Sequence, residues 1–281
     1  MSTSTPLLRR GAFDRLVLAA LVLLALVWML PLLWVLGLSF KPNEFLAGHT
    51  DVIFSGPFTL ENYLDILHTS AVFRWLGNSA WVALCQTVGV LVLSSLAGYG
   101  FARTEFPGRK IIFAMVMFGL AVPAQTTFIP LHRLFSYWNL QNTYAGLILP
   151  GLAAPFGVYL MTQYFKAIPP DLEEAAMLDN ASRLKIFFRV VLPLTVPAQV
   201  TLAIFTFLGS WNDYLWPLVI ATKPEMYTLT RGLASTQTNF AQSEGLGFLM
   251  AQAVFAGLPI LTLYLFFQKY LVTAVAGNGR H

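Results

Sequence analysis

The sequence predicts an all-α membrane protein that crosses the bilayer six times, and three observations support this prediction. Hydrophobic residues make up 57% of the 281-residue chain and charged residues only 11%, whereas soluble proteins have about 25% charged residues. The apolar residues are gathered into long runs without charge, and most basic residues lie in every second segment between these runs. So few charged side chains could not cover a soluble protein of this size. We therefore expect most of the surface to face lipid.

Six charge-free runs are the predicted transmembrane helices, namely 16–40, 75–102, 111–131, 134–165, 190–212 and 245–268. Each is long enough, because a helix needs about 20 residues to cross the hydrocarbon core. Backbone groups in lipid must form their hydrogen bonds internally, which favours helices. The fourth run is polar at its start, so its span is expected to begin near Tyr144. We expect a single membrane domain over 1–281, with a first transmembrane helix at about 16–38, a core at about 74–272 and a cytoplasmic tail at 273–281.

The distribution of basic residues predicts that both termini are cytoplasmic, because cytoplasmic segments are rich in Lys and Arg. In this orientation the cytoplasmic segments hold Arg9, Arg10, Arg15, Arg103, Arg109, Lys110, Lys166, Arg183, Lys185, Arg189, Lys269 and Arg280. The outer segments hold only Lys41, Arg74, Arg133, Lys223 and Arg231. The positive net charge of +4 is thus explained by the basic residues of the cytoplasmic segments. It therefore does not indicate nucleic-acid binding. The run at 16–40 is too long for the apolar part of a signal peptide, so we interpret it as a retained helix.

Small residues gather on the second run: Gly89, Ser94, Ser95, Ala97, Gly98 and Gly100. Small side chains let helix backbones approach closely in membranes. This face is therefore expected to pack against a neighbouring helix.

No constellation in the sequence indicates catalysis or a metal site. Cys85 is the single cysteine, which excludes an intrachain disulfide, and the four histidines lie in different segments. The chain has no G-x-x-x-x-G-K-[S/T] motif, since Gly108-Arg109-Lys110 lacks the leading glycine. We therefore expect no cofactor in this chain and no enzymatic activity of its own.

The segment between the fourth and fifth runs predicts a helix–turn–helix over 171–192. Asp171 is placed to cap a first helix, with Glu174 as its reciprocal partner. That helix is expected to end at Asn180, because asparagine tolerates the left-handed conformation found at helix C-termini. Ser182 is placed to cap a second helix, which continues to Leu192.

The spacing within this loop resembles the signature E-A-A-x3-G-x9-I-x-L-P of the membrane subunits of bacterial ATP-binding-cassette (ABC) importers. The chain has Glu174-Ala175-Ala176, then Asn180 after three residues, and Val190-x-Leu192-Pro193 after nine more. It differs in having Asn for Gly at 180 and Val for Ile at 190. The alternative interpretation is a chance amphipathic loop between two spans, which the matched spacing disfavours.

Other segments are similar to the carbohydrate-uptake branch of this family, in particular to its maltose-permease-G-like half; they are 38–42, 59–63, 106–109, 211–217 and 267–272. The usual ending of that branch, Gly-Leu-Thr-x-Gly-x-Val-Lys-Gly, is replaced here by the sequence at 274–279. A contact of this tail with an ATPase is therefore left open.

The resemblance implies a type I ABC importer permease fold in the bacterial cytoplasmic membrane and a defined set of partners. A second, homologous permease subunit would complete the pathway, and two ATPase subunits on the cytoplasmic side would hold ATP and Mg²⁺. An extracytoplasmic solute-binding protein would deliver a sugar or sugar derivative. The loop would couple the ATPase to the pathway through Glu174, Ala175, Ala176, Asp179, Asn180 and Ala181. The alanines would allow close approach, and Glu174 would offer its charge to a basic residue.

Polar and aromatic residues in or near the spans are candidates for a substrate pathway or gate: Asn78, Gln125, Trp211, Asn212, Asp213 and Tyr214. Buried polar groups are costly in a membrane and commonly mark function. A sugar needs amide and carboxylate partners for its hydroxyls and aromatic faces for its C–H surface. The alternative for each residue is hydrogen bonding between helices, and the pocket could also lie in the partner subunit.

Two other functions remain as alternatives to an importer subunit. An ion-coupled secondary transporter would act without an ATPase, but it needs carboxylates at mid-depth, and Asp213 is near the end of its run. An integral membrane enzyme would need a catalytic constellation that the sequence lacks. Whether the cargo is a sugar, a polyol, a sugar phosphate or a sulfonated sugar derivative stays open.

Overall fold

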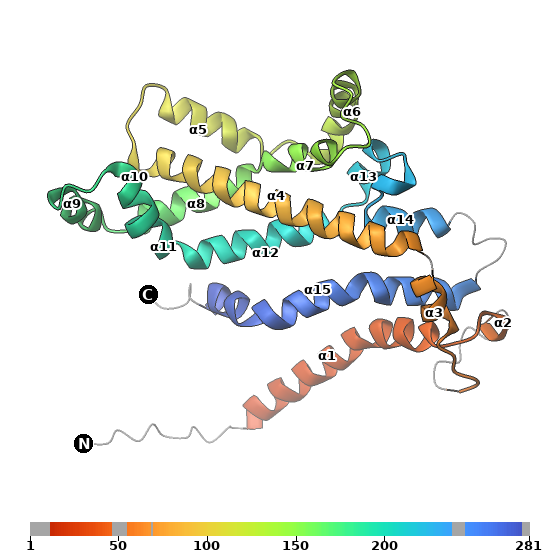
Figure 1. Ribbon diagram of the computed structural model, residues 1–281. Coiled ribbons are helices and arrows are strands. Elements are labelled where there is room, and N and C mark those ends of the chain that lie inside the picture. The colour runs from red at the N-terminus through yellow and green to blue at the C-terminus, as the bar shows by residue number, and fades with distance from the viewer. Residues whose placement is uncertain (1–11, 47–54, 69, 238–244, 277–281) are drawn as a thin grey trace. The chain divides into compact units, whose positions relative to one another are not determined.

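The computed structural model describes residues 12–46, 55–68, 70–237 and 245–276, and every regular element in these ranges is a helix (Figure 1). The elements are α1 (Ala12–Ser39), α2 (Asn43–Leu46), α3 (Glu61–His68), α4 (Ser70–Arg103), α5 (Arg109–Phe118), η1 (Ala124–Thr127), α6 (Phe128–Tyr137), α7 (Tyr144–Leu152), α8 (Pro155–Ala167), α9 (Asp171–Leu178), α10 (Arg183–Ile186), η2 (Phe187–Val191), α11 (Leu192–Leu194), α12 (Val196–Asn212), α13 (Leu215–Ile220), η3 (Pro224–Met226), α14 (Leu229–Gln237) and α15 (Gly245–Ala276). The predicted all-α class is confirmed.

The chain divides into two compact units. The first comprises Met1–His68 and Gln237–Gly257, and the second comprises Thr69–Thr236 and Leu258–His281. Helix α15 therefore contributes residues to both units. The helix–turn–helix loop belongs to the second unit.

In the first unit, Asn62 of α3 joins the end of α1 to the chain that follows it. Its amide nitrogen donates to the carbonyl oxygens of Ser39 at 3.0 Å and Lys41 at 2.9 Å. Asn43 donates to Oδ1 of Asn62 at 3.2 Å and accepts from the backbone N–H of Phe248, in α15, at 3.2 Å. These bonds satisfy backbone groups that the helix ends leave open.

Lys41 is fully buried beside this junction. Its Nζ donates to the carbonyl of Ser55 at 2.7 Å and lies 3.6 Å from the centre of the Phe58 ring. A carbonyl oxygen and an aromatic face both attract a cation. The ammonium group is thus held away from water by these two partners.

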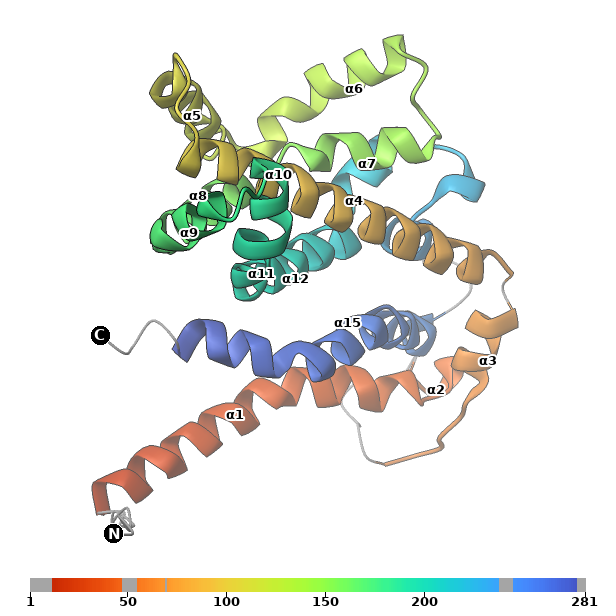
Figure 2. The ribbon, with the colours of Figure 1, turned by 60° about the vertical axis from the view of Figure 1, so that its left-hand side comes forward.

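In the second unit, α4 packs against α7, α8 and α12 (Figure 2). Buried side chains of these helices and of the loop form one core cluster: Val90, Met161, Phe165, Ile186, Phe187, Val191, Ala198 and Leu202. A further cluster contains Val82, Phe135, Leu147, Trp216, Ile220 and Ala221. Because Ile186, Phe187 and Val191 lie in the first cluster, the second half of the loop is anchored in the core.

The small-residue face of α4 is closely packed at Gly98. A Cβ at Gly98 would lie 2.7 Å from the Cβ of Met161 and 2.9 Å from the backbone nitrogen of Thr162, both in α8. A Cβ at Gly89 would lie 2.5 Å from a methyl group of Leu152 in α7. These glycines let α4 approach its neighbours, as the sequence predicts.

Three helices in the described ranges are long and apolar enough to cross a membrane: Phe13–Ser39, Ala71–Arg103 and Gly245–Thr262. Two helix pairs pass the same test but are bent, Tyr144–Leu152 with Pro155–Ala167 by 46° and Arg183–Leu194 with Val196–Asn212 by 76°. If each pair is one span, the described residues supply five candidates. The count of six spans and the cytoplasmic position of both termini stay predictions.

The run 111–131 does not form the continuous helix that we expected. Helix α5 ends at Phe118, and the short 3-10 helix η1 begins at Ala124 after Pro123. Gly119 and Pro123 lie at the two ends of the break. Both favour it, because glycine is a weak helix former and proline has no N–H to continue a helix. The expectation was wrong because a run without charge can still contain helix-breaking residues.

Candidate functional site

The first half of the loop is the eight-residue helix α9. The carbonyl of Pro170 accepts from the backbone N–H groups of Glu173 at 2.9 Å and Glu174 at 3.1 Å. Pro170 therefore occupies the N-cap position, and the predicted capping by Asp171 was wrong. Asp171 is instead the first helical residue, where its charge still complements the positive end of the helix dipole.

Asn180 forms the turn that ends α9, and it has the predicted left-handed conformation with φ 55°. The N–H of Asn180 donates to the carbonyl of Met177 at 3.0 Å, and the N–H of Ala181 donates to that of Ala176 at 3.1 Å. This pair of bonds is the Schellman pattern, in which a left-handed residue satisfies the last carbonyls of a helix. Asparagine at 180 thus adopts the left-handed conformation that glycine adopts readily.

The second half of the loop begins as predicted and then departs from a regular α-helix. The hydroxyl of Ser182 accepts from the N–H of Lys185 at 3.4 Å, which caps α10. The next five residues form the π-helix η2, and the N–H of Leu192 donates to the carbonyl of Phe187. Pro193 follows and has no N–H to offer to a carbonyl one turn earlier. The wider turn accommodates the proline before α12 begins.

The predicted coupling residues differ in exposure. Glu174, Ala175, Asp179 and Asn180 are exposed. Ala176 and Ala181 are half-buried and pack against the core cluster that contains Phe165 and Phe187. Of the two alanines that were expected to allow close approach of the ATPase, only Ala175 is exposed.

Two apolar side chains beside the turn are strongly exposed, Leu178 at 85% and Leu184 at 69%. Neither leucine was among the predicted coupling residues, although apolar residues on both sides of a turn in a polar loop indicate an exposed apolar surface. Exposed apolar groups gathered at one place commonly mark an interaction site. We call Glu174, Ala175, Leu178, Asp179, Asn180 and Leu184 the exposed loop surface.

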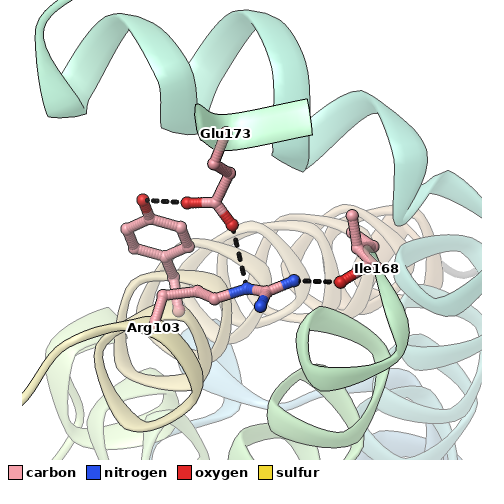
Figure 3. A network of polar contacts seen from close by, with 4 residues as sticks. Arg103, Ile168 and Glu173 are labelled. Carbon is pink, nitrogen blue, oxygen red and sulfur yellow. Dashed lines mark hydrogen bonds and ion pairs between the residues drawn. The ribbon is translucent and has the colours of Figure 1, made fainter. Parts of the chain in front are cut away.

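Glu173 and Arg103 join the start of α9 to the end of α4 (Figure 3). Nε of Arg103 lies 2.9 Å from Oε1 of Glu173, and the two side chains are only 15% and 12% exposed. Oε2 of Glu173 accepts from the hydroxyl of Tyr99 at 3.0 Å. Nη2 of Arg103 donates to the carbonyl of Ile168, the residue after α8. The base of the loop is thus held to the end of α4 by two side chains of that helix.

The side-chain amide of Asn78, a predicted pathway residue, is hydrogen-bonded to other parts of the chain. Its nitrogen donates to the carbonyls of Glu225 and Tyr227, at 2.9 Å each, and its oxygen accepts from the hydroxyl of Tyr144 at 2.8 Å. These bonds connect α4, α7 and the η3 segment. The arrangement corresponds to the alternative of hydrogen bonding between helices.

The predicted pathway residues 211–214 differ in exposure and in their partners. Trp211 is buried and stacks on Phe207 with ring centres 5.7 Å apart, whereas Asn212 is exposed and donates to the carbonyl of Leu208 at 2.9 Å. The carboxylate of Asp213 accepts from the N–H of Trp216 at 3.4 Å. Tyr214 is exposed.

Asp213 lies just beyond α12. Burial raises the pKa of its carboxyl above the ordinary value, while bonds from the backbone N–H groups of Trp216, Leu215 and Tyr214 act in the opposite direction. Gln125, the remaining predicted pathway residue, is exposed in η1. A pathway role for these residues stays a prediction.

The chain is similar to several curated permeases over most of its length. It is 34% identical over 259 residues to the arabinooligosaccharide transport system permease of Halalkalibacterium halodurans, covering 91% of this chain and 92% of that protein. It is 33% identical over 266 residues to the diacetylchitobiose uptake permease of Streptomyces coelicolor, covering 92% and 86%. It is 31% identical over 269 residues to the trehalose/maltose transport permease of Thermococcus litoralis, covering 94% and 95%.

A solved structure shares the fold. It is a chain of a bacterial ABC transporter involved in the import of the polysaccharide alginate, with a TM-score of 0.80, 22% identity and coverage of 95% of this chain and 99% of that one. In addition, residues 90–277 match the model of the binding-protein-dependent transport system inner membrane component. The chain is therefore a member of this family of multi-pass ABC importer permeases of the inner membrane, the family that its 174–193 segment resembles.

Proposed function

We propose that this chain carries a sugar or oligosaccharide as one of two permease subunits of an ABC importer. The observation that carries the proposal is the loop of 171–192, in which an exposed surface is built on a base anchored in the core. The family places such chains in binding-protein-dependent systems. The relatives named above take arabinooligosaccharides, diacetylchitobiose and trehalose or maltose, which supports a carbohydrate as cargo.

The exposed loop surface is proposed to dock on the ATPase. Leu178 and Leu184 supply apolar area that water solvates poorly, and Ala175 lets a partner approach the backbone of α9. Glu174 carries a charge that a basic residue of the ATPase would pair with on docking. The exposed left-handed turn at Asn180 holds α9 and α10 in a fixed relation.

The partners follow from this role. A second permease completes the pathway, two ATPase subunits bind ATP and Mg²⁺ and hydrolyse the ATP, and a binding protein delivers the cargo from outside. One solved relative, an alginate transporter with a TM-score of 0.57 and 16% identity, is in complex with a pentasaccharide-bound periplasmic protein. That assembly supports the same arrangement here.

Reconstitution tests the proposal. The chain would be co-expressed with its candidate partner permease and ATPase, and the complex placed in proteoliposomes with the binding protein. We expect ATPase activity to rise when the binding protein is loaded with an arabinooligosaccharide, diacetylchitobiose or trehalose. Import driven by an ion gradient in the absence of ATP would instead support a secondary transporter.

A further inference from the structure

Two successive carboxylates of α9 lie in opposite environments. Glu174 is exposed, whereas Glu173 is turned inward and is 12% exposed in its ion pair with Arg103. The outward carboxylate is available to a partner. The inward one is engaged with the protein's own α4.

The attachment of Glu173 to α4 has two points. Oε1 faces Nε of Arg103 at 2.9 Å, and Oε2 accepts from Tyr99 at 3.0 Å. Tyr99 and Arg103 are four residues apart, so they lie one above the other on the same face of the helix. Oε2 is held by a hydrogen bond, and Oε1 makes an ion-pair contact that lacks hydrogen-bond geometry, so the two contacts together tie the first turn of α9 to α4.

The same two residues of α4 also reach both ends of the loop. Arg103 donates to the carbonyl of Ile168, just before α9. The ring of Tyr99 packs on Phe165 of α8 with centres 5.6 Å apart and on Phe187 of η2 with centres 5.0 Å apart. The last turn of α4 is therefore connected to the entry, the first helix and the exit of the loop.

Replacing a buried ion pair by well-packed apolar residues often costs no stability, and the best-attested use of such a pair is to fix one register. Here the fixed register relates the loop to α4, which in turn packs against α7, α8 and α12.

We propose that Glu173 is a positioning residue that makes α9 and the end of α4 move as one body, so that displacement of the loop by the ATPase reaches the helices of the second unit. The proposal rests on the proposed function and names the route by which the docked loop acts. Glu173 itself would touch neither ATP nor cargo.

The test measures the coupling ratio, defined as cargo molecules imported per ATP hydrolysed by the full complex in proteoliposomes. Glu173→Gln removes the charge that faces Arg103 while keeping the size of the side chain. Tyr99→Phe removes only the hydroxyl and keeps the ring packed on Phe165 and Phe187. Glu105→Gln is the matched control, because Glu105 is an exposed carboxylate two residues beyond α4.

We expect Glu173→Gln to lower the coupling ratio by about fivefold or more, the lower end of typical coupling between sites, with basal ATP hydrolysis and complex assembly retained. Tyr99→Phe should lower the ratio by a smaller factor, and Glu105→Gln should leave it unchanged. A merely structural role would reduce the yield of complex but not the ratio in the complex that forms.

A wild-type coupling ratio in Glu173→Gln would overturn the proposal. If Glu173→Gln prevents assembly, Tyr99→Phe decides by the same criterion, with a wild-type ratio overturning the proposal and a lowered one supporting it. Failure of the proposed function gives a different result, because the wild-type complex would then show no ATP-driven import at all.

Discussion

Ala176 and Ala181 are joined across the Asn180 turn by a hydrogen bond of 3.1 Å, and both are half-buried against the core, whereas Ala175 is exposed. Ala175 and Ala176, the two alanines of the motif, thus have different surroundings. Ala176 contacts the protein's own core, and Ala175 faces the space that a partner would occupy. This difference separates effects on folding from effects on docking.

Tryptophan at 175 and at 176 should have different consequences. Ala176→Trp forces a large side chain against the core and should lower stability by about 1–3 kcal/mol, as overpacking does. Ala175→Trp should leave the melting temperature of the purified complex near that of the wild type but reduce the cargo-stimulated ATPase activity. Equal melting temperatures for the two variants would contradict the difference in burial.

The turn at residue 180 should keep its conformation with glycine and be distorted by valine. Gly adopts the left-handed conformation freely, so Asn180→Gly should preserve cargo-stimulated ATPase activity. A residue with a branched Cβ pays about 1–2 kcal/mol in this conformation, so Asn180→Val should distort the turn and lower the stimulation. Normal stimulation in Asn180→Val would show that the turn is not needed for coupling.

The charge of Glu174 should be needed for assembly with the ATPase. Removing one partner of a buried, hydrogen-bonded charge pair costs about 2–5 kcal/mol of binding, so Glu174→Ala should release the ATPase in a pull-down. Asp171→Ala is the control, because Asp171 is also exposed in the first turn but loses only a helix-dipole contribution of about 0.3–1 kcal/mol. Retention of the ATPase by Glu174→Ala would exclude Glu174 from the contact.

The bonds of Asn78 should stabilise the second unit. Asn78→Leu removes three part-buried hydrogen bonds, to the carbonyls of Glu225 and Tyr227 and from the hydroxyl of Tyr144, each of which contributes about 0.5–1.5 kcal/mol. Tyr144→Phe loses a single bond and should cost about 0.5–1.5 kcal/mol. Melting temperatures in detergent test this order. If transport fails in Tyr144→Phe with no change in melting, a pathway role would be favoured instead.

Gly98 should be far less tolerant of a methyl group than Gly77 on the same helix. A Cβ at Gly98 meets the backbone of α8, so Gly98→Ala should destabilise by about 1–3 kcal/mol. Among the described residues no atom lies within 4 Å of a Cβ at Gly77, so Gly77→Ala should stabilise by about 0.5–1 kcal/mol through helix propensity. Thermal unfolding of both variants in detergent measures the contrast, and equal changes would contradict the close packing.

Local sequence rules predicted the features that depend on neighbouring residues. Composition predicted the helical class, and the left-handed preference of Asn180 and the hydroxyl of Ser182 predicted the turn and the second cap. The rules were wrong at Asp171, where the preceding Pro170 takes the capping position. They also treated 111–131 as one helix, although Gly119 and Pro123 favour a break.

Features that depend on distant residues could not be predicted in this way. Glu173 and Arg103 are 70 residues apart, and only packing of α8 against α4 brings them together. The sequence therefore could not distinguish the inward Glu173 from the outward Glu174. In the same way, the amide of Asn78 is indistinguishable from a cargo-binding group until its carbonyl partners are known.

The burial of Lys41 has a consequence for covalent labelling of the first unit. An amine-reactive reagent needs an accessible nitrogen, and the Nζ of Lys41 is bonded to the Ser55 carbonyl under the ring of Phe58. Lys223 is exposed and would react at the rate of a free lysine. Modification of Lys41 therefore requires local opening of the junction between α1 and α3, as exchange of a buried amide does. Its labelling rate would report the opening free energy of this junction independently of unfolding in the second unit.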